Sequence, residues 1–99
     1  MAEKLADIIN LIKKSPIIIA NRDKNMITRY RLGITVEDQK EIIKSLKTKD
    51  YYQGPMADHN GTAGSIWVFK KRAYGEILYI KIKYGDPLIV ISCHIDERS

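Results

Sequence analysis

Residues 76–83 read Glu-Ile-Leu-Tyr-Ile-Lys-Ile-Lys, and this stretch decides the fold class. Apolar and polar side chains alternate along it, which indicates a β-strand with one buried and one open face, because successive strand side chains point to opposite sides. The apolar members are predicted to face a core: Leu78, Ile80 and Ile82. The polar members are predicted to share the open face: Tyr79, Lys81 and Lys83.

Two segments of the same character flank this strand, residues 65–71 and residues 87–95, and both are rich in β-branched and aromatic side chains. Two-residue turns at Tyr74-Gly75 and Gly85-Asp86 predict a three-stranded antiparallel meander. In that register Lys70 lies opposite Tyr79 and Arg72 opposite Ile77, Tyr79 faces Ser92, Lys81 faces Val90, and His94 is diagonal to Tyr79. One face of the predicted sheet then collects six side chains: Lys70, Arg72, Tyr79, Lys81, Lys83 and His94.

Helical patterns precede the strands. Apolar residues recur at helical spacing over residues 2–14, and the run Ile17-Ile18-Ile19 favours a short extended segment. A second helix is predicted from a cap at Asn21 to about Leu32, with Gly33 as its stop. Its apolar stripe consists of Met26, Ile27, Tyr30 and Leu32.

A third helix is predicted over residues 36–46, because Thr35 followed by Asp38 forms a capping-box pattern. Beyond Asp50, an aromatic stretch beginning at Tyr51 is interrupted by Gly54-Pro55, and residues 58–64 read as a polar loop. Helices followed by strands predict an α+β domain, with N-terminal helices packed on one face of a C-terminal antiparallel sheet. The open face is where we expect function.

Composition limits the possible functions. The 99 residues suffice for a single domain spanning residues 1–99, with 44% hydrophobic and 29% charged residues as in an ordinary globular protein. The net charge of +5 favours anionic partners such as nucleic acid or an acidic protein. No apolar run approaches the length of a membrane span, and the N-terminus lacks the pattern of a secretory signal, so we expect a cytoplasmic protein.

The predicted open face combines several cations with a phenol and an imidazole, which suits metal-independent RNA cleavage. In that reaction the ribose 2′-hydroxyl attacks the adjacent phosphate, with a base, an acid and cations assisting. Cofactors are not expected. Three alternatives stay open: an ordinary solvated sheet face, a non-catalytic nucleic-acid-binding or regulatory module, and a metal-dependent nuclease using Asp58, His59, His94 and Asp96.

Other conspicuous side chains are interpreted as structural. Cys93 is the only cysteine, so it forms no internal disulfide, and it points away from His94 by alternation. It is predicted to be a buried small hydrophobe, and Trp67 is predicted to belong to the core. Tyr51 and Tyr52 point to opposite faces, so only one of them can contact RNA; the RNA-contacting candidate is Tyr52.

Several segments together resemble a known family: Leu32-Gly33-Ile34-Thr35, Asp50-Tyr51-Tyr52-Gln53-Gly54-Pro55, Trp67-Val68-Phe69, Leu78-Tyr79-Ile80-Lys81 and Val90-Ile91-Ser92-Cys93-His94. Over roughly residues 4–95 the chain is similar to the MqsR-family toxins of type II toxin–antitoxin systems. The resemblance implies a RelE-like α+β fold and a sequence-selective mRNA interferase that arrests translation. It also implies a cognate antitoxin as partner and mRNA as substrate, and leaves a need for the ribosome open.

The resemblance also carries site residues over to this chain. The family's catalytic tyrosine matches Tyr79 and the strand lysine after it matches Lys81, whereas the C-terminal catalytic lysine is replaced by His94. Gln53 stands where the family has a lysine, and Val68 where it has a glutamine. Histidine transfers protons well near neutral pH, so His94 can replace that lysine in catalysis. The expected catalytic set is therefore His94 and Tyr79 for proton transfer, with Lys81 and Lys70 for holding the phosphate. The expected RNA-binding set is Gln53, Arg72, Lys83 and Tyr52.

Overall fold

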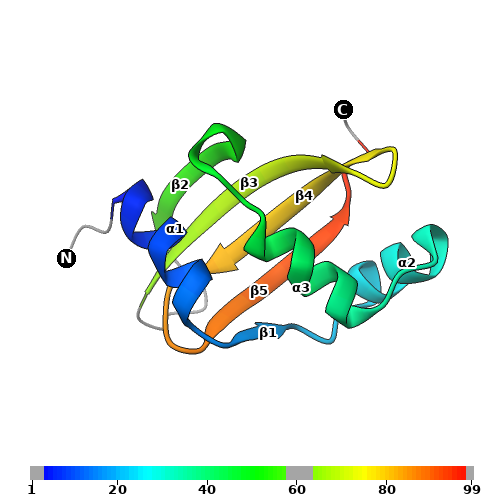
Figure 1. Cartoon of the computed structure of the whole chain (residues 1–99), viewed down its shortest axis with the longest axis horizontal. Helices are drawn as coiled ribbons and strands as arrows, with labels where there is room; N and C mark the ends of the chain where they lie inside the picture. The colour runs from blue at the N-terminus through cyan, green and yellow to red at the C-terminus, as the bar shows by residue number, and fades with distance from the viewer. Residues whose placement is uncertain (1–3, 58–63, 98–99) are drawn as a thin grey trace.

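The chain is an α+β domain, as predicted, in which three helices precede most of a five-stranded sheet (Figure 1). This computed structural model describes residues 4–57 and 64–97. The elements in chain order are α1 (Leu5–Lys14), β1 (Ile17–Ile19), α2 (Asp23–Leu32), α3 (Val36–Lys44), a single 3₁₀ turn (Thr48–Asp50), β2 (Tyr51–Ala57), β3 (Ser65–Ala73), β4 (Glu76–Lys83) and β5 (Leu88–Ile95).

The sheet has the order β1-β5-β4-β3-β2; the predicted antiparallel meander of β3, β4 and β5 is confirmed, and β2 adds a further antiparallel strand beside β3. The sheet as a whole is mixed, because β1 runs parallel to the first half of β5 and pairs Ile17 with Leu88 and Ile19 with Val90. The isoleucine run indicated an extended segment, and that prediction is confirmed. Its partner strand could not be predicted, because two helices and three strands separate β1 from β5 in the chain.

The core lies between one face of the sheet and the two helices α1 and α3, which cross that face in Figure 1. The predicted alternation of β4 is confirmed, since the three apolar side chains that point to this face are fully buried: Leu78, Ile80 and Ile82. Trp67 and Phe69 of β3 are also buried, as predicted. Full burial of one such large apolar side chain is worth about 1.5–3 kcal/mol, so this face holds the domain together.

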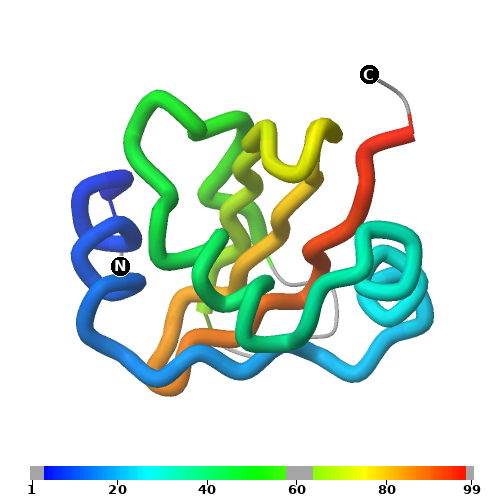
Figure 2. The backbone as a smooth tube through the Cα atoms, turned by 45° about the vertical axis from the view of Figure 1, so that its right-hand side comes forward, coloured from blue at the N-terminus to red at the C-terminus, as the bar shows by residue number. Residues whose placement is uncertain are grey.

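Helix α2 does not pack on that face. Figure 2 shows it beside the upper part of β5, at the edge of the sheet. The apolar stripe that predicted this helix does not mark its buried face, because Met26, Ile27 and Tyr30 are 43%, 54% and 89% exposed. The buried members of α2 are instead the polar residues Asn25 and Thr28. These two side chains are buried because they form hydrogen bonds with backbone groups, so hydrophobic periodicity does not identify the buried face of α2.

Polar side chains complete the edge of β5 where β1 ends. The Asn25 amide donates to the carbonyls of Ala20 and Ile91 over 2.9 and 3.2 Å, and its oxygen accepts from the amide of Cys93 over 2.8 Å. The Thr28 hydroxyl accepts from the amide of Ile95 over 3.2 Å. Backbone amides and carbonyls at an unpaired sheet edge need hydrogen-bond partners, because without them they are either buried unsatisfied or open to pairing with another chain. Side chains of α2 supply such partners to β5.

The ends of the helices follow the sequence signals in part. Gly33 ends α2 in the left-handed conformation (φ 67°), as predicted, whereas the residue that precedes the helix is Arg22 and not Asn21. Thr35 caps α3, with its hydroxyl accepting from the Asp38 amide and the Asp38 carboxylate accepting from the Thr35 amide. The capping box is therefore confirmed, although α3 ends at Lys44 and not at residue 46.

Replacing Thr35 by alanine is expected to lower the free energy of unfolding by about 1 kcal/mol, because the Asp38 amide loses its acceptor at the helix start. Thermal and urea unfolding of the variant measure the loss. Thr48→Ala is the matched control, because the Thr48 side chain is exposed and forms no hydrogen bond among the described residues. Equal stabilities of the two variants would contradict the capping role.

The aromatic stretch from Tyr51 was predicted to be interrupted at Gly54-Pro55, but strand β2 continues through these residues to Ala57. Two register shifts against β3 accommodate the irregular residues. A Cβ atom at Gly54 would lie 2.7 Å from the carbonyl oxygen of Ile66, so glycine allows the two backbones to approach. The predicted polar loop from residue 58 lies outside the described residues, except for Gly64.

Within residues 4–57 and 64–97 no helix has the length and apolar content needed to cross a membrane.

Candidate active site

Tyr79 of β4 and His94 of β5 are directly opposite each other on the sheet face that α1 and α3 leave open. Their rings stack at a centroid distance of 5.3 Å and an interplanar angle of 21°. The predicted pairing of Tyr79 with Ser92 is wrong, and so is that of Lys81 with Val90. Ser92 pairs with Lys81, because the β4–β5 connection is longer than two residues and the register shifts between Lys81 and Ile82. The shift keeps His94 on the predicted face and brings it closer to Tyr79.

The other predicted turn is confirmed. Tyr74 and Gly75 both have positive φ angles, of 54° and 79°, as the two central residues of a tight hairpin turn require. Lys70 therefore pairs with Tyr79 and Arg72 with Ile77.

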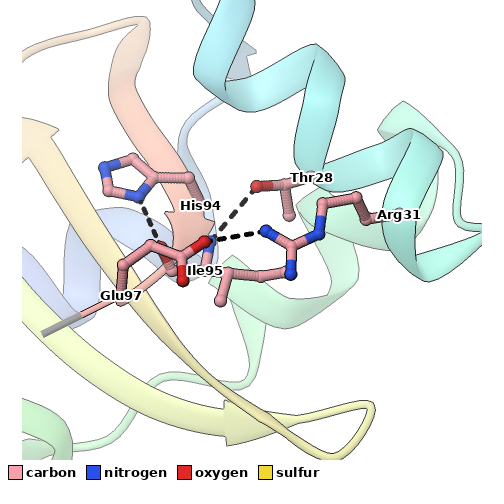
Figure 3. Close-up of polar contacts among 5 residues, drawn as sticks. All are labelled: Thr28, Arg31, His94, Ile95 and Glu97. Atoms are coloured by element: carbon pink, nitrogen blue, oxygen red, sulfur yellow. Dashed lines mark hydrogen bonds and ion pairs between the residues drawn. The ribbon is translucent and has the colours of Figure 1, made fainter. Parts of the chain in front are cut away.

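The His94 imidazole is held in one orientation. Its Nδ1 lies 3.0 Å from the carbonyl oxygen of Ile95, as Figure 3 shows. A carbonyl oxygen only accepts hydrogen bonds, so Nδ1 carries the proton in this contact. In the neutral ring Nε2 then keeps its lone pair and can accept a proton, which is the requirement for a general base.

A cavity of about 540 Å³ lies in front of these two rings. Lys81, which follows Tyr79 by two residues on the same face, also lines it. The Lys81 ammonium forms no ion pair or hydrogen bond within the part of the chain that the structure describes. The cavity therefore contains a cation available to a bound anion, next to a phenol and an imidazole.

The second wall of this cavity is helix α2, which the sequence did not place there. The full lining consists of Arg22, Lys24, Ile27, Thr28, Arg31, Tyr79, Lys81, Ser92, His94, Ile95, Asp96 and Glu97. Four of these share one face of α2 at helical spacing: Lys24, Ile27, Thr28 and Arg31. The spacing of these four residues is visible in the sequence. It indicates a cavity wall only once the position of α2 against β5 is known, and the apolar pattern did not predict that position.

Two basic side chains of this wall contact β5 and the segment after it. The Arg31 guanidinium and the Glu97 carboxylate are 2.7 Å apart, and both side chains are substantially exposed (Figure 3). Arg22 donates to the Ser92 hydroxyl over 3.2 Å. These contacts connect the α2 side of the cavity to β5 and to the segment that follows it.

Lys70 is on the predicted face but does not line the cavity. Its ammonium lies 2.8 Å from the Asp96 carboxylate and 4.2 Å above the ring of Tyr52. The Asp96 side chain is 3% exposed and the Lys70 side chain 27% exposed, so the pair is largely withdrawn from solvent. The Lys70 ammonium thus forms an ion pair with the Asp96 carboxylate and a cation–π contact with the Tyr52 ring.

The other predicted RNA-binding residues lie away from the two stacked rings. Gln53 is exposed on β2, at the opposite edge of the sheet from β1, where it pairs with Val68. Arg72 is exposed near the tip of the β3–β4 hairpin, and Lys83 lies at the other end of β4. None of the three lines the cavity, and their roles stay predictions.

Cys93 is fully buried, as predicted. Burial raises the pKa of the Cys93 thiol to about 12, an effect that the nearby positive charge of Arg29 opposes. A thiol with this pKa stays protonated at neutral pH, so Cys93 is a core side chain and not a nucleophile.

Asp58 and His59 of the metal-dependent alternative lie outside the described residues. Across residues 4–57 and 64–97, the structure contains no group of three or more His, Cys, Asp or Glu side chains placed to hold a metal ion. Within this part of the chain, the candidate catalytic groups are therefore the stacked rings of Tyr79 and His94 and the basic side chains that line the same cavity.

A family model described as "Motility quorum-sensing regulator, toxin of MqsA" matches residues 2–95. No curated protein matches the chain.

Proposed function

The chain belongs to the MqsR toxin family, and from that premise we propose that it is an mRNA interferase, a metal-independent endoribonuclease that arrests translation. Membership makes it a toxin of a toxin–antitoxin pair, and the family description names an antitoxin, MqsA, as the partner of such toxins. The observation that carries the enzymatic proposal is the stack of Tyr79 on His94 beside the Lys81 ammonium, which has no ion-pair partner among the described residues.

The proposed reaction is attack of a ribose 2′-hydroxyl on the adjacent phosphorus. A bond forms from the 2′-oxygen to phosphorus while the bond to the 5′-oxygen breaks, which leaves a 2′,3′-cyclic phosphate and a 5′-hydroxyl end. Nε2 of His94 accepts the proton of the 2′-hydroxyl, because Nδ1 already donates to Ile95. The Tyr79 hydroxyl, which has no hydrogen-bond partner among the described residues, donates its proton to the 5′-oxygen.

Lys81 stabilises the negative charge that grows on the phosphoryl oxygens, because its ammonium faces the same cavity as the two rings. In our proposal Lys70 acts through Asp96: its ammonium holds in place the buried Asp96 carboxylate, which lines the cavity. The face-to-face stack keeps the His94 ring from rotating while it exchanges a proton, since the Tyr79 ring covers one side of it.

Incubation of the purified protein with long single-stranded RNA in the presence of EDTA tests the proposal. We expect discrete cuts with cyclic phosphate and 5′-hydroxyl ends, and sequencing of the fragments gives the sequence preference. If free RNA stays intact, the same measurement in a translation extract tests whether the ribosome is required. RNA that is bound in a salt-sensitive way but never cut, with or without ribosomes, would favour the non-catalytic binding module.

A further inference from the structure

One face of α2 looks into the cavity without taking part in the proposed chemistry. Lys24, Ile27, Thr28 and Arg31 follow each other at spacings of three, four and seven residues from Lys24, so they form one continuous stripe. The sheet face with Tyr79 and His94 forms the opposite wall. A strand of RNA bound at the stacked rings would lie between this stripe and the sheet.

The charges around the cavity favour a polyanion. Its lining contains four basic side chains and two carboxylates, and each carboxylate already has a basic partner: Asp96 has Lys70, and Glu97 has Arg31. Lys24 has no ion-pair partner among the described residues. Lys24 and Lys81 thus present uncompensated positive charge from opposite walls of the same cavity.

The Arg31–Glu97 contact resembles the contact that a phosphate would make. The guanidinium fork binds carboxylate and phosphate oxygens in the same geometry, and here a carboxylate oxygen lies 2.7 Å away. The Arg31 and Glu97 side chains are 49% and 70% exposed. Exposed ion pairs of this kind contribute little to stability, so an incoming phosphate can displace Glu97 at small cost.

We infer that α2 is the phosphate-binding wall of the RNA groove, and that Arg31 exchanges Glu97 for a backbone phosphate adjacent to the scissile one when RNA binds. Lys24 binds a further phosphate about two helical turns away, and the exposed side chain of Ile27 between them packs against a base. The inference rests on the proposed function. A volume of about 540 Å³ suits one or two unpaired nucleotides, which agrees with recognition of single strands.

The test measures binding apart from cleavage. A fluorescently labelled single-stranded 2′-O-methyl RNA lacks the attacking hydroxyl, so anisotropy titrations report affinity alone. We compare the wild type with Arg31→Gln, Lys24→Gln and Glu97→Gln, and use Lys44→Gln as the matched control. Lys44 is exposed in the last turn of α3 and outside the cavity, so its replacement removes the same charge without touching the groove.

We expect Arg31→Gln and Lys24→Gln each to weaken binding about five- to tenfold at low salt and to reduce the slope of log affinity against log salt by about 0.7. Glu97→Gln is expected to tighten binding about two- to fivefold, because the competing carboxylate is lost. Lys44→Gln should change affinity less than about twofold, as expected of a distant charge. Circular dichroism melting establishes that each variant is folded.

Arg31→Gln and Glu97→Gln values that match those of Lys44→Gln would overturn the inference, and so would a wild type that does not bind the modified RNA. Cleavage of unmodified RNA is measured in parallel. Wild-type protein that cuts RNA while the α2 variants bind normally would refute only the role of α2. Wild-type protein that binds through α2 but never cuts would refute only the enzymatic proposal.

Discussion

A His94→Ala protein is expected to fold normally and to cut RNA at least about 10³-fold more slowly than the wild type. General acid–base catalysis by a positioned side chain contributes about 10²–10⁴-fold, and the substitution also removes the ring against which Tyr79 stacks. The fold should survive, because within residues 4–57 and 64–97 the imidazole forms a hydrogen bond only with its neighbour Ile95 and none with the core. Single-turnover cleavage of a labelled RNA in EDTA measures the rate.

Two further variants make this result specific. Tyr79→Phe keeps the aromatic stack but lacks the hydroxyl, so it separates proton donation by Tyr79 from support of the His94 ring. Lys44→Ala removes a cation far from the cavity and should cut at the wild-type rate. A folded His94→Ala protein that cuts within about tenfold of the wild-type rate would remove His94 from the mechanism.

Replacing Lys70 by methionine is expected to lower the free energy of unfolding by about 2–3 kcal/mol. Removing one partner of a fully buried ion pair costs about 3–5 kcal/mol, because the other charge stays buried without its counter-ion. The exposure of Lys70 reduces that cost, whereas Asp96 is almost completely enclosed. Urea unfolding measures the change, and Lys44→Met is the control for loss of a surface lysine.

The double variant Lys70→Met/Asp96→Asn tests the cause of that loss. With the buried carboxylate neutralised, we expect at least half of the lost stability to return. A single Lys70→Met variant that loses less than about 0.5 kcal/mol would show that the pair is unimportant for stability. Cleavage by the double variant then tests the predicted role of Lys70 in holding the phosphate, because positioning through Asp96 no longer contributes.

Strands β3 to β5 and the face that Tyr79 and His94 share could be predicted because their signals are local. The alternation around Tyr79 gave the two faces of β4, and Tyr74-Gly75 gave the β3–β4 register because both turn residues must have positive φ. The face shared by Tyr79 and His94 survived an error of two residues in the β4–β5 register, since a shift of two preserves side-chain direction. A shift of one would have separated them.

The position of α2 could not be predicted, because its packing is polar. Hydrophobic periodicity assumes that the buried face of a helix is apolar, whereas α2 buries Asn25 and Thr28 to satisfy backbone groups of β5. The pairing of Lys70 with Asp96 was also missed, because it spans β4 and depends on where the chain leaves β5. Both features depend on contacts between segments distant in sequence.

Among the described residues no strand pairs with the outer side of the β5 half that carries His94, and its backbone amides there donate to side chains of α2, while Gln39 of α3 donates to the Cys93 carbonyl. Helix and strand are therefore expected to open and close together as one cooperative unit. By linkage, a ligand that binds α2 shifts that equilibrium toward the closed form and so keeps the imidazole in place. A molecule that draws α2 away from β5 would release His94 without ever touching it.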